Sequence, residues 1–433
     1  MRVVKKTRGQ WSSGFGFMMA AAGAAVGLGN IWGFPYKLGE GGGFVFLAAY
    51  LFFVVAVGYP VLLGELAIGR KTGSGAIGAY QTLGKRYRFV GVLGVGACFL
   101  ILGYYVYFGG LIMDFAAEYT GNLLTGSNAL VTGEHGSFVS VLWLLAFVGV
   151  TFVIVLRGVQ GGIELCSKFM MPALLVMLIY LAGKSLALPG AGDALRYLFV
   201  PDLDKLTPQT ISSALTQVFF SLSLGQGIMV TYGSYLGKKE NLERSAAIIP
   251  ILDTLVAVLA AVVIIPAVFS FGLAPDAGPN LMFDALPLVF FEMRGGNVLG
   301  FLFFLLLFFA AVTSSISMLE TVASALTEQL KVRREKAVPL VAIFAALMGI
   351  PVCLDRSLFL TYEYVSQYIM VSLGALIMCL LLGWGPGRGM VEQEAALGDG
   401  RFHLERPWRF LIRYVSPVLV LFVLLISLGI FKI

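Results

Sequence analysis

The chain has 433 residues, of which 58% are hydrophobic and only 12% are charged, and its mean hydropathy is +0.89. This composition excludes a soluble globular protein and indicates a protein that crosses a lipid bilayer several times. The net charge of +6 does not indicate a nucleic-acid partner, because the basic residues gather in loops between apolar runs.

Apolar runs of about twenty residues recur along the whole chain. They show no period-2 alternation, so they predict an all-α polytopic membrane protein and not a barrel. We count about eleven spans, which lie near residues 12–38, 43–69, 89–120, 139–157, 164–187, 210–236, 244–273, 297–329, 337–354, 358–385 and 407–431.

Lysine and arginine are concentrated in alternate loops. Basic clusters occupy residues 1–8, 70–88, 238–244 and 331–336, whereas the intervening loops are mixed or acidic. The positive-inside rule then predicts a multi-pass protein of the plasma (inner) membrane with a cytoplasmic N-terminus. With an odd number of spans, the C-terminus is expected outside.

Two spans contain glycine clusters that argue against a continuous helix. Residues 23–35 read GAAVGLGNIWGFP, and residues 219–227 read FFSLSLGQG. Each glycine weakens a helix by about 0.5–1 kcal/mol, and carbonyls freed at membrane depth need a polar partner. Either cluster alone could reflect close helix packing. Together, at corresponding places in two five-span halves, they predict the binding site of a transporter.

This symmetry predicts a single domain, 1–433, made of two repeats. The first repeat is 12–187 and the second, inverted because each half has an odd number of spans, is 210–385. The span at 407–431 lies outside the repeat.

Several motifs resemble those of the neurotransmitter:sodium symporter family, in the same order over nearly the whole chain. They are AAGAAVGLGNIWGFPY (21–36), GGGF (41–44), GELAIGR (64–70), YYVYFGG (104–110), QVFFSLSLGQGIMVTYGSY (217–235) and FFAAVTSSISMLE (308–320). The resemblance is to an eleven-span bacterial branch. It implies an inverted five-plus-five helix repeat with broken helices 1 and 6, plus an eleventh helix.

The resemblance also implies two sodium sites, since Na⁺ is a hard cation that needs about five or six oxygen ligands. The first site would combine the substrate carboxylate with Ala25, Asn30, Ser221 and Asp253, and the second would use Gly23, Val26, Ala310, Thr313 and Ser314. Taken alone, the hydroxyls at 313–315 are equally typical of side chains bonded back to the carbonyl four residues earlier.

Asp253 lies in the apolar stretch IIPILDTLVAVLAAVV, where an unpaired carboxylate costs at least about 2.5–3.5 kcal/mol. Its partner must be Na⁺, a proton or a basic side chain, and no basic residue is near in sequence. The family usually carries asparagine here, and its chloride-dependent members carry a serine one turn later, where this chain has Ala257. We therefore expect Asp253 to supply the fixed negative charge, so that chloride is not required.

The substrate implied by the resemblance is a neutral L-amino acid with a hydrophobic or small side chain. Backbone N–H groups of Leu28 and Gly29 would bind its carboxylate, assisted by Tyr105. Carbonyls would hold the ammonium, and a mostly apolar pocket would select the side chain. The predicted binding residues are Ala24, Ala25, Leu28, Gly29, Ile101, Tyr105, Phe220, Ser221, Ser223, Gln226, Ser314 and Met318. Gln226 either bonds to a polar substrate group or narrows the pocket.

Gates are expected on both sides of this pocket. On the outer side, Gly33 stands where relatives have an arginine, so Lys37 is the replacement that could reach the acid Glu363, with Tyr107 and Phe220 as a lid. On the inner side, the predicted gate is Arg8, Trp11, Tyr235 and Glu328.

The predicted function is a sodium-coupled symporter that imports a neutral amino acid by alternating access and uses two Na⁺ ions. A proton-coupled transporter with Asp253 as the proton carrier is the alternative. An intramembrane enzyme is a remote one, because Ser221 and Ser314 have no histidine or lysine partner at membrane depth.

Overall fold

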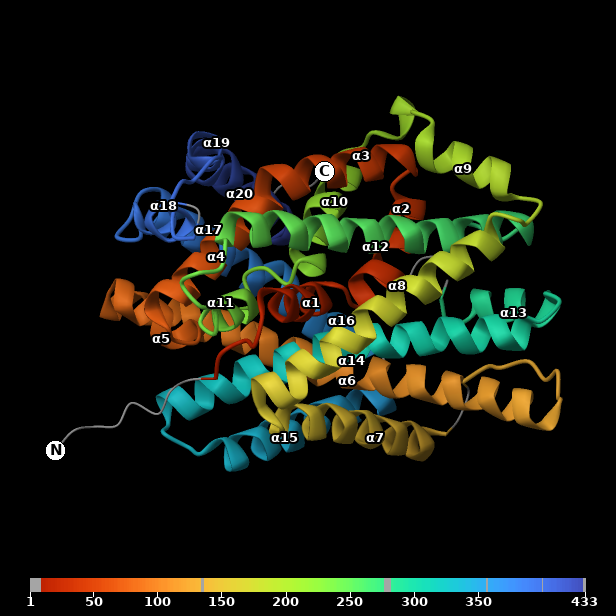
Figure 1. Ribbon diagram of the computed structural model, residues 1–433. Helices are drawn as coiled ribbons and strands as arrows, with labels where there is room; N and C mark the ends of the chain where they lie inside the picture. Colours follow the sequence, from red (N-terminus) through yellow and green to blue (C-terminus); the bar gives the residue numbers. More distant parts are fainter. Residues whose placement is uncertain (1–8, 134–135, 276–281, 356, 399, 431–433) are drawn as a thin grey trace.

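The computed structural model describes residues 9–133, 136–275, 282–355, 357–398 and 400–430, and within these ranges it contains helices and no strands. Long helices lie roughly side by side in Figure 1 and connect two ends of the molecule. We call these the α5 end, which carries α5 (Ala76–Leu83) and α18 (Met390–Ala395), and the α9 end, which carries α9 (Ala191–Phe199) and α13 (Ala285–Glu292).

The spanning segments follow the apolar runs closely. They comprise α1 (Gly14–Ala25) with η1 (Gly29–Gly33) and α2 (Phe34–Glu40); α3 (Phe44–Phe53), η2 (Val54–Gly58) and α4 (Tyr59–Thr72); α6 (Arg88–Thr125); α7 (Ser137–Leu156); η4 (Val159–Glu164) with α8 (Leu165–Ser185); α10 (Pro208–Ser221) with α11 (Ile228–Gly233); α12 (Leu242–Ser270); α14 (Gly296–Gln329); α15 (Arg334–Leu354); α16 (Ser357–Glu363), η7 (Tyr364–Val371) and α17 (Ser372–Gly383); and α19 (Glu405–Phe410), η8 (Leu411–Val415) and α20 (Ser416–Ser427).

Nine of these helices are long and apolar enough to cross a membrane, or ten when the bent pair at α1 is taken as one span, within the part of the chain that the structure describes. The remaining predicted span, 210–236, is divided between α10 and α11, and neither piece is long enough alone. The interruption predicted from the glycines therefore explains the difference from about eleven spans.

Short helices in the connections were not anticipated. They are α5, α9, α13 and α18, together with the single turns η3 (Lys85–Tyr87) and η5 (Leu203–Lys205). These segments are too short to span a bilayer and carry no long apolar run, so hydropathy alone assigns them to loops.

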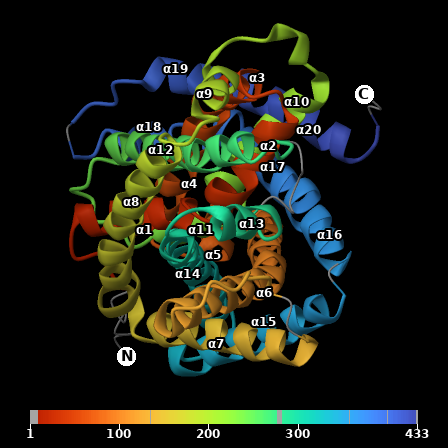
Figure 2. The same cartoon turned by 90° about the vertical axis from the view of Figure 1, so that its right-hand side faces the viewer.

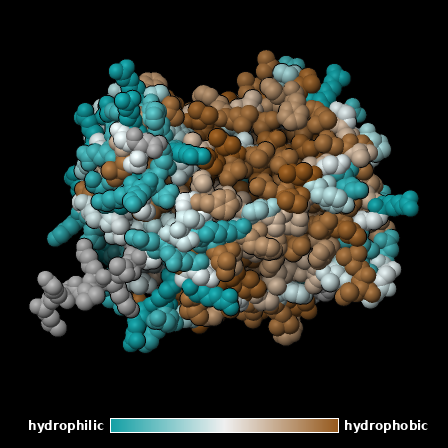
Figure 3. Space-filling model, viewed as in Figure 1, coloured by the Kyte–Doolittle hydropathy of each residue, from teal (hydrophilic) through white to brown (hydrophobic). Residues whose placement is uncertain are grey.

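Helix α14 lies near the centre of the bundle and packs against α6, α8, α15, α7 and α1. Figure 2, turned by 90°, shows α14 enclosed between α6 on one side and α8 and α12 on the other. The hydrophobic band in Figure 3 lies between the two ends, and hydrophilic residues gather most densely at the α5 end. The centre of α14 and both helix breaks are therefore placed deep inside the apolar part of the protein.

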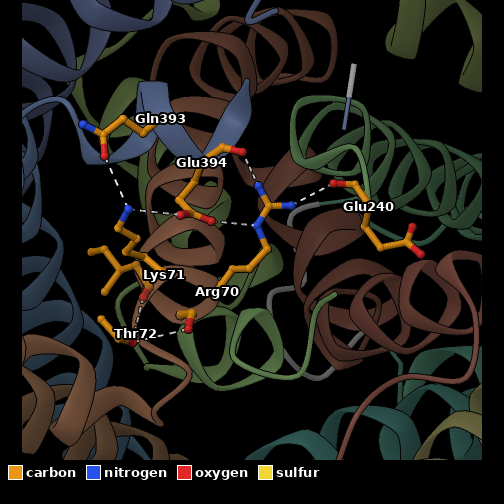
Figure 4. Close-up of polar contacts among 8 residues, drawn as sticks. Arg70, Lys71, Thr72, Glu240, Gln393 and Glu394 are labelled. Atoms are coloured by element: carbon orange, nitrogen blue, oxygen red, sulfur yellow. Dashed lines mark hydrogen bonds and ion pairs between the residues drawn. The ribbon is translucent and has the colours of Figure 1, made fainter. Parts of the chain in front are cut away.

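At the α5 end, the connection that carries α18 is attached to α4 by a buried arginine (Figure 4). The Arg70 guanidinium donates from Nε to the Glu394 carboxylate at 3.0 Å, from Nη1 to the Glu240 carbonyl at 2.7 Å, and from Nη2 to the Glu394 carbonyl. Both side chains of the Arg70–Glu394 pair are almost fully buried. Arg70 thus joins three parts of the chain: α4, α18 and the segment that precedes α12.

Candidate functional site

The first helix break begins where α1 ends at Ala25. Val26 adopts an extended conformation, and the chain bends by 50° between Gly14–Ala25 and Gly29–Glu40. The Gly27 N–H donates to the side-chain oxygen of Asn30 at 3.0 Å, and the Leu28 N–H donates to the Tyr105 hydroxyl at 3.3 Å. The interruption is thus held by side chains in place of helix bonds.

The second break separates α10 from α11. Ser223, Gly225 and Gly227 have φ of 52°, 73° and 74°, a left-handed conformation that interrupts the helix. The Ser223 hydroxyl donates to the Ala24 carbonyl at 2.9 Å, and the Gly225 N–H donates to the Glu65 carboxylate at 2.7 Å. The first of these bonds ties the two breaks together.

A small cavity lies between the breaks. Every residue predicted to bind the substrate lines it except Ser221, and Gly27 and Ser317 line it in addition. None of its lining side chains is charged. It is closed on several sides, because a Cβ at Gly27 would lie 2.4 Å from the Ser314 hydroxyl and one at Gly29 would lie 3.0 Å from the Phe220 ring.

Asp253 lies beside the breaks, fully buried, with three side chains that donate to its carboxylate. They are Asn30 at 2.7 Å, Ser221 at 2.8 Å and Tyr50 at 3.0 Å. The Asn30 amide also donates to the Ser221 hydroxyl at 2.9 Å. The described part of the chain provides no ion-pair partner for Asp253. The Asn30 amide turns its nitrogen to this cluster, while its oxygen accepts from the Gly27 N–H, so carboxylate and hydroxyl oxygens, the ligands that a hard cation prefers, lie beside the first break.

The five residues predicted for a second sodium site also converge. The Ser314 hydroxyl donates to the carbonyls of Gly23 and Val26 at 3.4 and 3.3 Å. The Thr313 hydroxyl donates back to the carbonyls of Phe309 and Ala310 at 3.0 and 3.1 Å. The back-bonding considered from the sequence is therefore present, next to the broken helix.

Toward the α9 end, a second hollow lies over the cavity. It is lined by aromatic side chains together with Leu28, Gly33 and Glu363, and Phe220 lines both hollows. Tyr107 lines neither hollow and packs on Phe108, with ring centroids 5.2 Å apart. Phe220 therefore lies between the cavity and the second hollow, together with Leu28 and Tyr105, and its role as a lid stays a prediction.

Lys37 is placed differently from the expectation that it reaches Glu363. Its ammonium donates to the Gln217 side-chain oxygen at 3.0 Å, and Gln217 in turn donates to the Gly29 carbonyl at 2.6 Å. Among the described residues no ion pair joins Lys37 to Glu363. The ammonium lies 5.8 Å from the centroid of the Phe220 ring, so Lys37 is linked to the helix break and to this ring.

Toward the α5 end, Trp11 donates to the Tyr232 carbonyl at 3.1 Å and its ring packs against those of Tyr232 and Tyr235. The Tyr235 hydroxyl donates to buried Glu320 at 2.7 Å, and Arg334 pairs with Glu320 at 2.6 Å. This Trp11–Tyr235–Glu320–Arg334 group is hereafter called the charged closure.

Glu328, also predicted for the inner gate, lies outside this group. Glu328 accepts hydrogen bonds from the Gly75 N–H at 2.9 and 3.0 Å. Arg8 lies outside the described residues. Trp11 and Tyr235 of the predicted inner gate therefore lie together, and the buried acid beside them is Glu320, not Glu328.

Sequence reasoning missed Tyr50, Glu65, Glu320 and Arg334. The two glutamates carried the same signal as Asp253, an acid inside an apolar span, and that test applied to every span would have found them. Tyr50 carried no such signal, because tyrosines are common in apolar runs.

Comparisons with known proteins identify the family. The model of the sodium:neurotransmitter symporter family matches residues 8–135 and 132–432. An uncharacterized sodium-dependent transporter of Bacillus subtilis is 36% identical over 97% of this chain and 98% of its own length. The mouse sodium-dependent neutral amino acid transporter B(0)AT3 is 28% identical over 66% of this chain and 52% of its own.

Among solved structures, that of MhsT in complex with L-phenylalanine superimposes with a TM-score of 0.89, at 36% identity, over 97% of this chain and 100% of that one. The fold, the broken helices and these matches lead to one conclusion. This chain is a sodium-dependent membrane transporter, not an enzyme, and it belongs to the sodium:neurotransmitter symporter family.

Proposed function

We propose that the protein imports a neutral L-amino acid together with two Na⁺ ions by alternating access, without chloride. The observation that carries the proposal is the cavity at the two helix breaks, which has no charged side chain in its lining and lies next to the Asn30–Ser221–Asp253 cluster. A zwitterion can bond to backbone groups of the breaks through its carboxylate and ammonium, and an uncharged side chain suits the rest of the cavity.

The backbone of the breaks offers both kinds of partner that a zwitterion needs. The Leu28 and Gly29 N–H groups begin the second half of the first span, where the helix dipole favours a carboxylate. The carbonyls of Ala24, Phe220 and Ser223 are the acceptors for the ammonium. In this structure the Leu28 N–H donates to Tyr105 and the Ala24 carbonyl accepts from Ser223. A bound substrate would replace these internal hydrogen bonds with its own.

Coupling follows from shared ligands. Ala25 lines the cavity, and Asn30, Ser221 and Asp253 lie behind it, so one Na⁺ would be coordinated by protein oxygens and by the substrate carboxylate. Each would raise the affinity for the other by the same factor. Gly23, Val26, Ala310, Thr313 and Ser314 are proposed for the second ion. Moving one net charge inward draws about 2.3 kcal/mol per 100 mV from the membrane potential.

The proposed orientation puts the α5 end in the cytoplasm. The basic segments 70–88, 238–244 and 331–336 all belong to connections at this end, where hydrophilic residues gather in Figure 3. An odd number of spans then puts the C-terminus on the opposite side of the plasma membrane.

The test uses purified full-length protein in liposomes. Uptake of the twenty amino acids is measured with inward Na⁺, with K⁺ instead, and with chloride replaced by gluconate. We expect uptake of neutral amino acids that requires Na⁺ and ignores chloride. Asp253→Ala should abolish it, whereas Asp355→Ala, at an exposed carboxylate between α15 and α16, should not. Uptake that follows a pH gradient without Na⁺ would instead make Asp253 a proton carrier.

A further inference from the structure

One polar side chain of the cavity lacks a partner. Gln226 lies in the unwound segment between α10 and α11, lines the cavity and is only 3% exposed. Its side-chain amide makes no hydrogen bond to any residue in the part of the chain that the structure describes. The amide faces the cavity, so its hydrogen-bonding groups are open to whatever occupies the cavity.

The other polar side chains around the cavity are already engaged within the protein. Ser223 bonds to Ala24, Ser314 to Gly23 and Val26, Ser317 to the Ser314 carbonyl, and Tyr105 to the Leu28 N–H. The remaining lining contributes aliphatic, aromatic and thioether groups. Gln226 is therefore the polar side chain of this lining with both donor and acceptor capacity unused.

We propose that Gln226 reads the substrate's side chain, and that this transporter selects neutral amino acids whose side chain carries a hydroxyl or carboxamide group. The inference rests on the proposed function, because it assumes that an amino acid occupies this cavity. An amide pairs equally well with a hydroxyl or with another amide. An ionised side chain would be desolvated here with no opposite charge in the lining.

Water does not remove this selectivity. When the cavity is empty, water can satisfy the Gln226 amide, but an apolar substrate side chain displaces that water without replacing its hydrogen bonds. Sites built to bond to a substrate group discriminate strongly against analogues that lack it, because the protein group is left unpaired. The affinity for an apolar substrate of equal size is therefore lower whether or not the empty cavity holds water.

The experiment compares isosteric pairs of amino acids: threonine with valine, asparagine with leucine, and tyrosine with phenylalanine. Purified full-length protein in liposomes is given inward Na⁺, and kcat/KM is measured for each member. We expect the polar member to be preferred by about tenfold to a hundredfold in at least one pair. Gln226→Met, similar in length but without hydrogen-bonding capacity, should abolish or reverse that preference.

Met318→Leu is the matched control, because Met318 lines the same cavity with an apolar group. It should change uptake of both members of a pair together and leave their ratio within about threefold, as a volume-conserving swap does. Substrate-induced thermal stabilisation of the detergent-purified wild type gives a second readout of the same pairs, which holds even where Gln226→Met does not fold.

The outcomes separate the two proposals. Sodium-driven uptake with no preference within any pair, and an unchanged ratio in Gln226→Met, would overturn the role of Gln226 and leave sodium–amino acid symport standing. Absence of any sodium-driven amino acid uptake would overturn both.

Discussion

The two ends of the molecule close over the cavity with different chemistry. Toward the α9 end the cover is made of rings, since Trp32 lies 4.8 Å from Phe108 and 6.2 Å from Phe359 between centroids. Toward the α5 end it is the charged closure, in which fully buried Glu320 holds Arg334 at 2.6 Å. Ring pairs contribute about 0.5–1.5 kcal/mol each beyond their area and tolerate several geometries.

Separating a buried ion pair is a larger and more abrupt change, because it leaves a charge uncompensated at about 3–5 kcal/mol. We therefore expect that opening the α5 end costs more free energy than opening the α9 end. The rate at which Cys98 is alkylated can measure this opening. Its side chain is fully buried, and its thiol lies 3.7 Å from the carbonyl of Met318, a cavity residue.

The largest effect is expected from Arg334→Met, which leaves Glu320 buried without its cation. We expect the closed α5 end to lose about 3–5 kcal/mol, so that alkylation of Cys98, followed by peptide mass spectrometry, becomes at least about a hundredfold faster. The control is Glu405→Gln, which removes an exposed pair with Arg409 and should change stability by less than about 1 kcal/mol. Equal behaviour of the two variants would contradict the comparison.

The next effect is expected from Glu394→Gln at the attachment shown in Figure 4. Arg70 keeps its bonds to the carbonyls of Glu240 and Glu394, so we expect a loss of about 1.5–3 kcal/mol, typical of one hydrogen bond to a charged group. Thermal unfolding of purified protein measures it. Gln393→Glu, next in sequence but exposed and bonded only to Lys71, is the control. An unfolding temperature of Glu394→Gln equal to that of the wild type would show that α18 does not stabilise the α5 end.

A smaller effect is expected from Phe359→Leu at the ring cover. Phe359 packs on Tyr104, Trp32 and Phe108, so the closed α9 end should lose about 1.5 kcal/mol, the low end for three ring pairs because leucine keeps part of the apolar contact. Bound radiolabelled substrate should dissociate correspondingly faster toward that side. The rate of Cys98 alkylation should stay unchanged, because the charged closure is intact. Faster alkylation would mean that the two ends open together.

The smallest effect is expected from Lys37→Met, which repeats the chemistry of Arg334→Met at the other end. Lys37 is bonded to an uncharged amide and makes no direct ion pair with Glu363 among the described residues, so we expect a change below about 1.5 kcal/mol. Thermal unfolding and the sodium dependence of uptake measure it. A loss as large as that of Arg334→Met would show that Lys37 acts as a gate charge against Glu363.

The sequence predicted the fold class, the order of the spans and the places where two helices break, because glycine, hydropathy and charge act locally along the chain. Convergence of the cavity residues came from a motif resemblance, and the structure brings nearly all of them together. The partners of Lys37, Glu320 and Arg70 were not predictable in this way, because hydrogen bonds between segments far apart depend on helix rotation and tilt. Local periodicity carries no information about these quantities.

The three donors on Asp253 have a consequence for the return step of the cycle. A carrier that has released its cargo must change conformation with its ion sites vacant, and a bare carboxylate at membrane depth would oppose that step. Here Asn30, Ser221 and Tyr50 solvate Asp253 from within the protein. Any cation that arrives must compete with these three hydrogen bonds. The arrangement therefore lowers the affinity for the cation and favours a faster return of the empty carrier.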